Sequence, residues 1–346
     1  MFVFVWNHLG SSTIRAEIVS FNNRLRNQKT LKGYNHYQQH YIDYCVTQGF
    51  DHSKPSVEYL CKYLMKKFEE GKWTSASTFN QARSAISDMY RYNYNICIGE
   101  SDIVCATINN ISKHCDQPTQ KKPLTIDIIT RICSVVDVLK RDHVRNYYMM
   151  LLMTGGFLRE AEVVVLEMAR VHIIRDNNNV RGLEIEHIPF KKKTKEYVKK
   201  YISGAPSNLV LDVVTWHLLY MKYVINSGNI SSLYLFHNVN DRSKLADNTA
   251  WHAFNSLFQL AGINYAEYGS QSARRGGATA SFEAGVSVEL IKQHGNWASN
   301  AVERYLKPSS TTLLTTTSFL NNNIQTANTT TPTPNKEMHT YINSKR

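Results

Sequence analysis

An arginine and a glutamate stand three residues apart at the start of a predicted helix. Arg159 follows a Thr-Gly-Gly-Phe-Leu segment, Glu162 comes three residues later, and an apolar helix is expected over 160–168. At this spacing the two side chains share one face, so the carboxylate could hold the guanidinium in one orientation. The pair alone is weak evidence, because Arg-x-x-Glu on a helix is usually a solvent-exposed ion pair.

A second group of basic residues opens another predicted helix. Arg274 and Arg275 follow Gln271-Ser272-Ala273 and precede a run of small residues, in a helix expected over 275–284. A guanidinium and a helix N-terminus both attract a phosphate group. This segment therefore indicates an anion-binding site.

A tyrosine near the end of the second half belongs to a third segment that stands out. Tyr305 lies nine residues after Asn296, which belongs to a His-Gly-Asn-Trp segment, and a short helix is expected over 300–306. Between the two arginine segments, alternating stretches at 180–188 and 196–203 predict a β-hairpin. The tip of that hairpin is basic and holds Lys191, Lys192, Lys193 and Lys195.

These side chains must be positioned by a second domain, which the sequence predicts over 125–318. Its alternating strand at 196–203 is recognised from Tyr197, Lys199 and Tyr201. Its helices are expected at 126–138, 146–154, 160–168, 207–226, 248–261, 275–284, 287–294 and 300–306. The last residues, 319–346, are rich in Thr, Asn and Pro and are expected to form a disordered tail.

A helical domain is predicted ahead of it, over 29–114, after an N-terminal arm at 1–28. Apolar residues recur at helical spacing in four stretches, of which the first two end at Gly49 and Gly71. The third runs over about 75–92 and the fourth over about 101–113. The polar segment 115–124 carries two prolines and is typical of a linker.

The balance of charge favours a polyanionic partner. The 346 residues include 40 Lys+Arg against 28 Asp+Glu, for a formal net charge of +12. Nucleic acid is the first candidate, since no helix is both strongly basic and amphipathic and no stretch approaches the roughly 20 apolar residues of a membrane span. Six cysteines without a C-x-x-C pair indicate reduced thiols inside a cell. No P-loop, zinc-ligand spacing or magnesium-binding carboxylate cluster is recognisable, so no cofactor is expected.

Taken together, these segments resemble the tyrosine recombinase (phage integrase) family. The family's first motif reads T-G-x-R-x-x-E/D, which Thr154–Glu162 approaches with one extra residue before the arginine. The second reads H-x-x-R, and Gln271 stands in place of the histidine. The third reads G-H/W with a tyrosine ten residues after the glycine. Gly295 and Tyr305 keep that spacing, and Asn296 occupies the His/Trp position.

The resemblance implies a fold and a set of roles. The fold would be mainly α with a small β-hairpin or sheet, formed by a four-helix core-binding (SAM-like) domain and an α+β catalytic domain. Tyr305 would attack a DNA phosphodiester and form a 3′-phosphotyrosyl link. Arg159 and Arg274 would bind the phosphate oxygens in the transition state, with Glu162 orienting Arg159. Lys193, which aligns best with the family's hairpin position, would protonate the leaving 5′ oxygen, with Lys191, Lys192 and Lys195 as close competitors for this role.

The remaining candidates are more general. Gln271 and Asn296 occupy catalytic positions of the family, where an amide can hydrogen-bond a phosphate but cannot carry a proton. Further contacts to DNA phosphates are expected from Lys191, Lys192, Lys195 and Arg275 and, in the helical domain, from Lys62, Lys66 and Arg83. On helices such charges are usually a solvated face.

The function that the resemblance implies is site-specific DNA recombination or integration, without metal or nucleotide, by a protein encoded on a mobile element. The partner would be double-stranded DNA, bound by a homo-tetramer on two sites. Residues 309–320 are the candidate for a segment exchanged between neighbours. The expected compartment is the nucleus in a eukaryote and otherwise the cytoplasm. Two alternatives stay open: a non-catalytic DNA-binding protein derived from a recombinase, and strand relaxation of the type IB topoisomerase kind.

Overall fold

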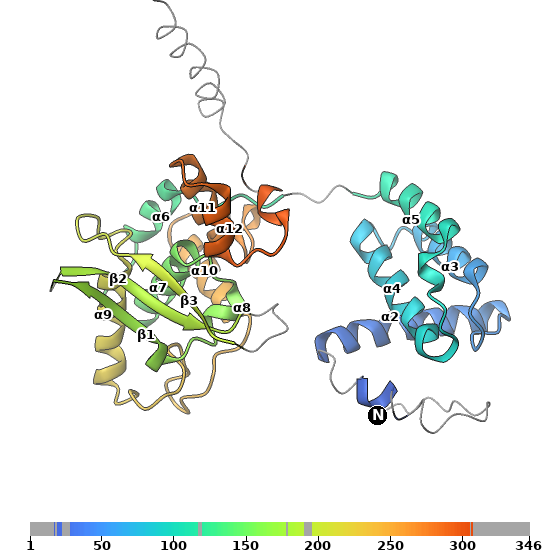
Figure 1. Ribbon diagram of the computed structural model, residues 1–346, viewed down its shortest axis with the longest axis horizontal. Coiled ribbons are helices and arrows are strands. Elements are labelled where there is room, and N and C mark those ends of the chain that lie inside the picture. Colours follow the sequence, from blue (N-terminus) through green and yellow to red (C-terminus); the bar gives the residue numbers. More distant parts are fainter. Residues whose placement is uncertain are drawn as a thin grey trace, which may run out of the picture. The chain divides into compact units, whose positions relative to one another are not determined.

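The computed structural model describes residues 17, 19–22, 28–116, 120–177, 179–189, 196–304 and 306. The chain divides into two compact units between Gln120 and Lys121 (Figure 1). Each unit is built around its own hydrophobic core. The expected tail at 319–346 and most of the expected arm at 1–28 lie outside the described residues.

Within residues 28–116, the first unit forms four helices and a short 3-10 turn. They are α2 (Gln28–Gln48), α3 (Val57–Glu69), α4 (Ala76–Tyr94), η1 (Ile98–Glu100) and α5 (Asp102–His114). Ser56 and Ser75 cap α3 and α4, each with a hydroxyl that accepts a backbone N–H bond. Gly49 and Gly71, just after α2 and α3, adopt φ of +69° and +66°, a conformation that favours glycine. The four helices expected in this part of the chain are thus present.

The core of this unit is aromatic. Tyr41, Tyr63 and Phe79 are fully buried, and the rings of Tyr41 and Tyr63 meet edge to face at 5.4 Å. Edge-to-face contacts of this kind add to the free energy gained by burying apolar surface. The tyrosines that recur along α2 and α3 thus pack the helices against each other.

The second unit surrounds one buried helix. Its elements are α6 (Ile126–Cys133), α7 (Arg141–Gly155), α8 (Glu160–Val163), η2 (Met168–Arg170), β1 (Val171–Asp176), β2 (Asn179–His187), β3 (Val198–Ser203), α9 (Val213–Asn226), α10 (Thr249–Leu260), η3 (Tyr265–Glu267), α11 (Ser272–Glu283), α12 (Val288–Gly295) and η4 (Asn300–Arg304). Helix α7 contacts α9, α10, α11 and β3, and Figure 1 shows it in the middle of the unit. Every residue from Asn146 to Met153 is buried, so α7 is the core on which the site is built.

The β structure is a three-stranded antiparallel sheet in the order β1-β2-β3 rather than a lone hairpin. Strand β1 was not predicted, because Ile173 and Ile174 stand side by side and hide the alternation of the strand. Strand β3 alternates as predicted. Its buried side chains are Lys200 and Ile202, whereas Lys199 and Tyr201, from which the strand was predicted, face outward.

Three helices are shorter than expected. The stretch 160–168 forms only the single turn α8, because the chain then runs beside another segment: Met168 donates its backbone N–H to Leu233, and Leu235 donates to Leu166. Helix α6 ends at Cys133, so the predicted residues up to 138 are not helical. Helix α9 begins only at Val213, where Asp212 caps it by accepting from the Thr215 N–H.

Candidate active site

Helix α11 packs against the end of α7 through Gly277 and against the segment before α6 through Gly276. A β-carbon on Gly277 would lie 2.0 Å from the carbonyl oxygen of Thr154, at the end of α7. A β-carbon on Gly276 would lie 1.9 Å from the carbonyl oxygen of Leu124. Only glycine permits this backbone contact. The Gly-Gly pair after Arg274 and Arg275 therefore brings the start of α11 against the C-terminal end of α7.

Arg274 is buried at this junction, with 2% of its surface exposed. Its guanidinium donates to the carbonyl oxygens of Phe157 and Gly295, each at 2.6 Å, and lies 4.2 Å from the centre of the Trp297 ring. Phe157 has φ of +48°, so the turn before Arg159 is locally left-handed. This turn contains the extra residue of the first motif, and its carbonyl group binds Arg274.

Glu162 connects the two arginines. It is 1% exposed, and one carboxylate oxygen lies 2.7 Å from the Arg159 guanidinium. The other accepts the Arg159 backbone N–H at 2.7 Å and lies 3.7 Å from the Arg274 guanidinium. The short helix α8 is held in place by Glu160, whose carboxylate accepts the backbone N–H of Trp251 at 3.0 Å. The structure thus brings together Arg159, Glu162 and Arg274, which are far apart in the sequence.

A lysine of β3 belongs to the same cluster and was missed by the sequence analysis. Lys200 is 2% exposed, and its ammonium donates to the carbonyl oxygen of His294. The pKa of Lys200 is lowered to about 7. Burial is the main cause, the nearby Arg274 acts in the same direction, and Glu162 opposes them. A lysine that is neutral half of the time near neutral pH can donate or accept a proton. The position of Lys200 between two outward-facing side chains of a strand was the signal that could have found it.

A histidine of β2 was missed as well. His187 is 3% exposed, and neither of its ring nitrogens has a hydrogen-bond partner among the described residues. Burial lowers its pKa to about 4, with Lys200 and Arg274 acting in the same direction and Glu162 in the opposite one. The imidazole is therefore neutral at physiological pH.

The His-Gly-Asn-Trp segment forms the end of α12 and the wall beside Arg274. His294 shares a hydrogen bond of 2.8 Å with the carbonyl oxygen of Gly155, and its ring meets Phe157 edge to face at 4.6 Å. Burial lowers the pKa of His294, and this hydrogen bond partly offsets the effect. Asn296 has φ of +53° as the left-handed residue that ends α12, a conformation that asparagine tolerates well.

The structure gives less information on the other predicted site residues of this unit. Gln271 is exposed just before α11 and makes no side-chain cap. Arg275 donates to the backbone carbonyl of Lys121, which fastens the start of the unit to α11. Tyr305 and the hairpin lysines Lys191, Lys192, Lys193 and Lys195 lie outside the described residues. Next to position 305, Val302 and Leu306 are buried in a cluster with Phe157.

In the first unit, two of the three predicted DNA contacts lie on α3. Lys62 is exposed with its ammonium 5.3 Å from the centre of the Phe50 ring, and Lys66 has the same distance to the Tyr44 ring. Arg83, on α4, is half-buried and lies 3.8 Å from the Cys105 sulfur of α5. Lys62 and Lys66 are thus four residues apart on α3, whereas Arg83 of α4 contacts α5.

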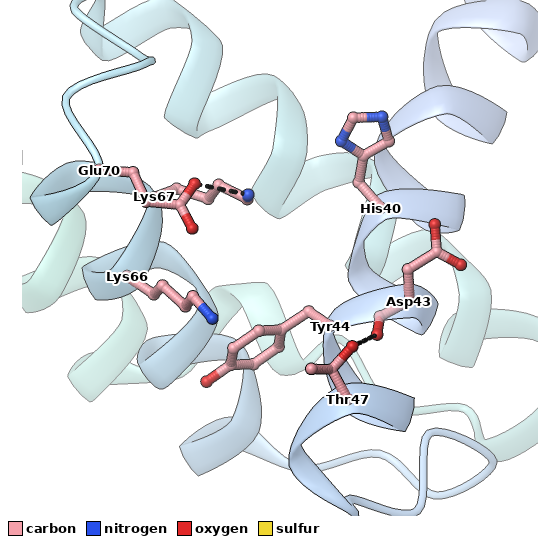
Figure 2. A pocket seen from close by; sticks show the side chains of 7 residues that line it. All are labelled: His40, Asp43, Tyr44, Thr47, Lys66, Lys67 and Glu70. Carbon is pink, nitrogen blue, oxygen red and sulfur yellow. Dashed lines mark hydrogen bonds and ion pairs between the residues drawn. The ribbon is translucent and has the colours of Figure 1, made fainter.

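Lys66 also lines a shallow pocket of about 220 Å³ between α2 and α3. Figure 2 shows the side chains that line it: His40, Asp43, Tyr44 and Thr47 from α2, and Lys66, Lys67 and Glu70 from α3. The carboxylate of Glu70 accepts from Lys67 at 2.9 Å, so part of the positive charge is neutralised within the pocket. Burial lowers the pKa of His40, and His36 and Lys67 add to this effect.

The profile of the phage integrase family matches residues 122–311. The chain belongs to the phage integrase family. No curated protein sequence matches the chain significantly. The family match supports a DNA breaking-rejoining enzyme for site-specific recombination, and it does not favour the non-catalytic or topoisomerase alternatives.

Solved structures show the same fold. A lambda integrase dimer bound to a COC′ core site has a TM-score of 0.54 at 15% identity, over 85% of this chain and 75% of that one. The XerH recombinase in a post-cleavage complex with a palindromic difH substrate has a TM-score of 0.56 at 16% identity, over 78% and 73%. The Tn1549 transposon integrase in complex with circular intermediate DNA has 0.54 at 11%, over 86% and 95%. The fold class expected from the sequence is thereby confirmed.

Two features are absent from the described residues. None of the helices in these ranges has the length and hydropathy needed to cross a membrane. Within the same ranges, no group of three or more His, Cys, Asp and Glu side chains is arranged to hold a metal ion.

Proposed function

We propose that this integrase-family chain recombines duplex DNA at specific sites with Tyr305 as its nucleophile. The phenolic oxygen forms a bond to phosphorus, the bond to the 5′ oxygen breaks, and the protein stays linked to the 3′ phosphate. The observation that best supports this is the buried Glu162 bound to both Arg159 and Arg274. This arrangement holds two guanidinium groups together for the charge of a phosphoryl transition state.

The leaving 5′ oxygen needs a proton, and two lysines are candidates to supply it. Lys193 is the hairpin lysine that the family motif favours. Lys200 is the lysine that lies in the described cluster with Arg274 and has a pKa lowered to about 7. A donor with a pKa near the working pH is suited to general acid catalysis.

Other side chains would bind DNA without taking part in bond breaking. Gln271 and Asn296 are proposed to hydrogen-bond phosphate oxygens. Lys191, Lys192, Lys195 and Arg275, together with Lys62, Lys66 and Arg83, are proposed to contact the phosphate backbone. Because arginines and a lysine supply the positive charge and the proton, the reaction is proposed to need no metal ion.

The active assembly is proposed to be a homo-tetramer on two DNA sites. A lambda integrase tetramer bound to a Holliday junction has a TM-score of 0.52 to this chain at 16% identity, over 83% of this chain and 76% of that one. The element that encodes the chain is proposed to be mobile. The compartment would be the nucleus in a eukaryote and otherwise the cytoplasm, where its DNA substrate lies.

Covalent trapping tests the proposal. The purified chain is incubated with nicked suicide duplexes made from the DNA that flanks its own gene, in the presence of EDTA. Cleavage beside the nick releases a short 5′-hydroxyl strand, so religation is blocked and an adduct that survives SDS accumulates. The variant Tyr305→Phe should give no adduct. The control Tyr201→Phe, at a tyrosine that is 56% exposed on β3, should react like the original chain.

Two results would contradict the proposal. An adduct that persists in Tyr305→Phe would identify another nucleophile. Salt-sensitive binding of the flanking DNA without any adduct would instead favour the non-catalytic DNA-binding alternative.

A further inference from the structure

His187 is a buried polar group for which the described part of the chain offers no hydrogen-bond partner to either ring nitrogen. A neutral imidazole offers one N–H donor and one acceptor, and leaving both unmade in the interior costs free energy. Such a group in a folded protein calls for an explanation. The surroundings of His187 provide one.

Charged groups face His187 from each neighbouring element. They are Lys200 of β3, Arg274 of α11, and Arg159 and Glu162 at the start of α8. Burial is the main reason that the pKa of His187 is low, and the three cations act in the same direction against Glu162, so the ring is neutral near neutral pH. A neutral imidazole among cations is an acceptor for an N–H group.

The pairing of β2 with β3 places Lys200 beside His187. Ile185 is paired with Lys200, and His187 is paired with Val198. Since side chains alternate along a strand, His187 and Lys200 lie on the same face as diagonal neighbours, at a separation of roughly 7–8 Å between their backbones. A lysine side chain can span this distance. The ammonium has three N–H groups, of which the His294 carbonyl takes one.

We propose that His187 is a positioning residue that accepts a hydrogen bond from Lys200 and holds its ammonium ready to protonate the leaving 5′ oxygen. The inference rests on the proposed function and specifies the proton donor within it. In the forward step a proton passes from the Lys200 ammonium to the 5′ oxygen, and the lysine keeps the lone pair. In religation the attacking 5′ hydroxyl returns that proton to the neutral amine.

The role of His187 can be separated from a merely structural one by the choice of substrate. In a 5′-bridging phosphorothiolate duplex the leaving atom is sulfur, which departs as a thiolate and needs no proton donor. His187→Leu removes the acceptor. It should slow cleavage of the ordinary duplex about 10- to 100-fold, less than the roughly 100- to 10,000-fold contribution of a general acid because Lys200 itself remains, and leave cleavage of the phosphorothiolate nearly unchanged.

Two further variants sharpen the test. His187→Asn keeps an acceptor and should recover part of the rate on the ordinary duplex. Lys200→Met should show the same dependence on substrate as His187→Leu, and the double variant should be no slower than Lys200→Met alone, because the histidine acts through the lysine. The rate of His187→Leu on the ordinary duplex should also fall at a lower pH than that of the original chain, as the lysine loses a group that stabilises its protonated form.

The results that would overturn the role of His187 differ from the result that would overturn the proposed recombinase function. Equal slowing of His187→Leu on both substrates would indicate a structural role, and no slowing on either would remove any role. Rescue of Lys193→Met by the phosphorothiolate, without rescue of Lys200→Met, would assign the proton to the hairpin lysine. An original chain that forms no adduct on either duplex would contradict the proposed function itself.

Discussion

Glu162 is the residue on which the candidate site depends. Its two oxygens reach the guanidinium of Arg159 at 2.7 Å and that of Arg274 at 3.7 Å, in a setting where the carboxylate is 1% exposed. A buried carboxylate between two cations fixes their positions, and its removal leaves uncompensated charge. At the residue scale, orientation of the arginines and stability of the fold therefore rest on the same group.

Replacing this carboxylate with its amide tests that dependence. We expect Glu162→Gln to lower the free energy of unfolding by about 3 kcal/mol and to slow adduct formation by about 10-fold or more, because the arginines lose their shared anion. Urea unfolding and the trapping assay measure the two effects. Glu184→Gln, which breaks only the strand-surface pair with Lys199, should cost at most about 1 kcal/mol and leave the rate unchanged. A Glu162→Gln rate equal to that of Glu184→Gln would refute the orienting role.

Sequence motifs located part of this site and missed the rest for a physical reason. Arg159, Glu162 and Arg274 were found because each stands at a helix start in a recognisable order. Lys200 and His187 were missed because a charged side chain on a strand gives no indication of whether it faces the core. The side that Lys200 faces depends on pairing with β2, which is a long-range contact.

At the scale of elements, the approach of α11 to α7 decides where Arg274 lies. The helical periodicity of α3, α4 and α5 was enough to predict them, since each buries one apolar stripe. The break at the end of α8 was not predictable in the same way. It depends on pairing with residues 233–235, some seventy positions later in the chain.

The glycine contact between α11 and α7 gives a prediction at this scale. Gly277→Ala would place a methyl carbon 2.0 Å from the carbonyl oxygen of Thr154. We expect a loss of about 1–3 kcal/mol in unfolding free energy and a slower adduct, because α11 must shift with Arg274. Gly33→Ala is the matched control, since its β-carbon would meet nothing within 4 Å in α2 and should stabilise that helix slightly. A Gly277→Ala variant as stable and active as the original chain would show that the close approach is not required.

At the scale of the whole molecule, buried histidines make stability depend on pH. Burial lowers the pKa of His187 and of His217 to about 4 from the usual 6.5. His217 shares a hydrogen bond of 2.8 Å with the hydroxyl of Tyr148 inside the core of the second unit. Because the unfolded chain binds these protons more readily, stability is complete above about pH 6.5 and falls as the pH approaches 4.

We expect each of these histidines to account for a loss of about 2 kcal/mol between pH 7 and pH 5. Urea unfolding at stepped pH, followed by tryptophan fluorescence, measures the slope. His217→Gln should flatten it by one histidine's share, whatever its effect on stability at pH 7, whereas His252→Gln at an exposed position should not. An unchanged slope in His217→Gln would mean that this ring is protonated equally in the folded and unfolded chain.

The carbonyl groups at the end of α12 are bound by the cations of the site. Lys200 donates to His294 and Arg274 donates to Gly295, where the helix carries its partial negative charge. Ten residues further along the chain stands Tyr305. A phosphate that binds at the site would therefore compete with the end of α12 for the same N–H donors, those of Lys200 and Arg274. By linkage, the affinity for DNA and the docking of the segment that leads to the tyrosine must influence each other to the same extent in both directions.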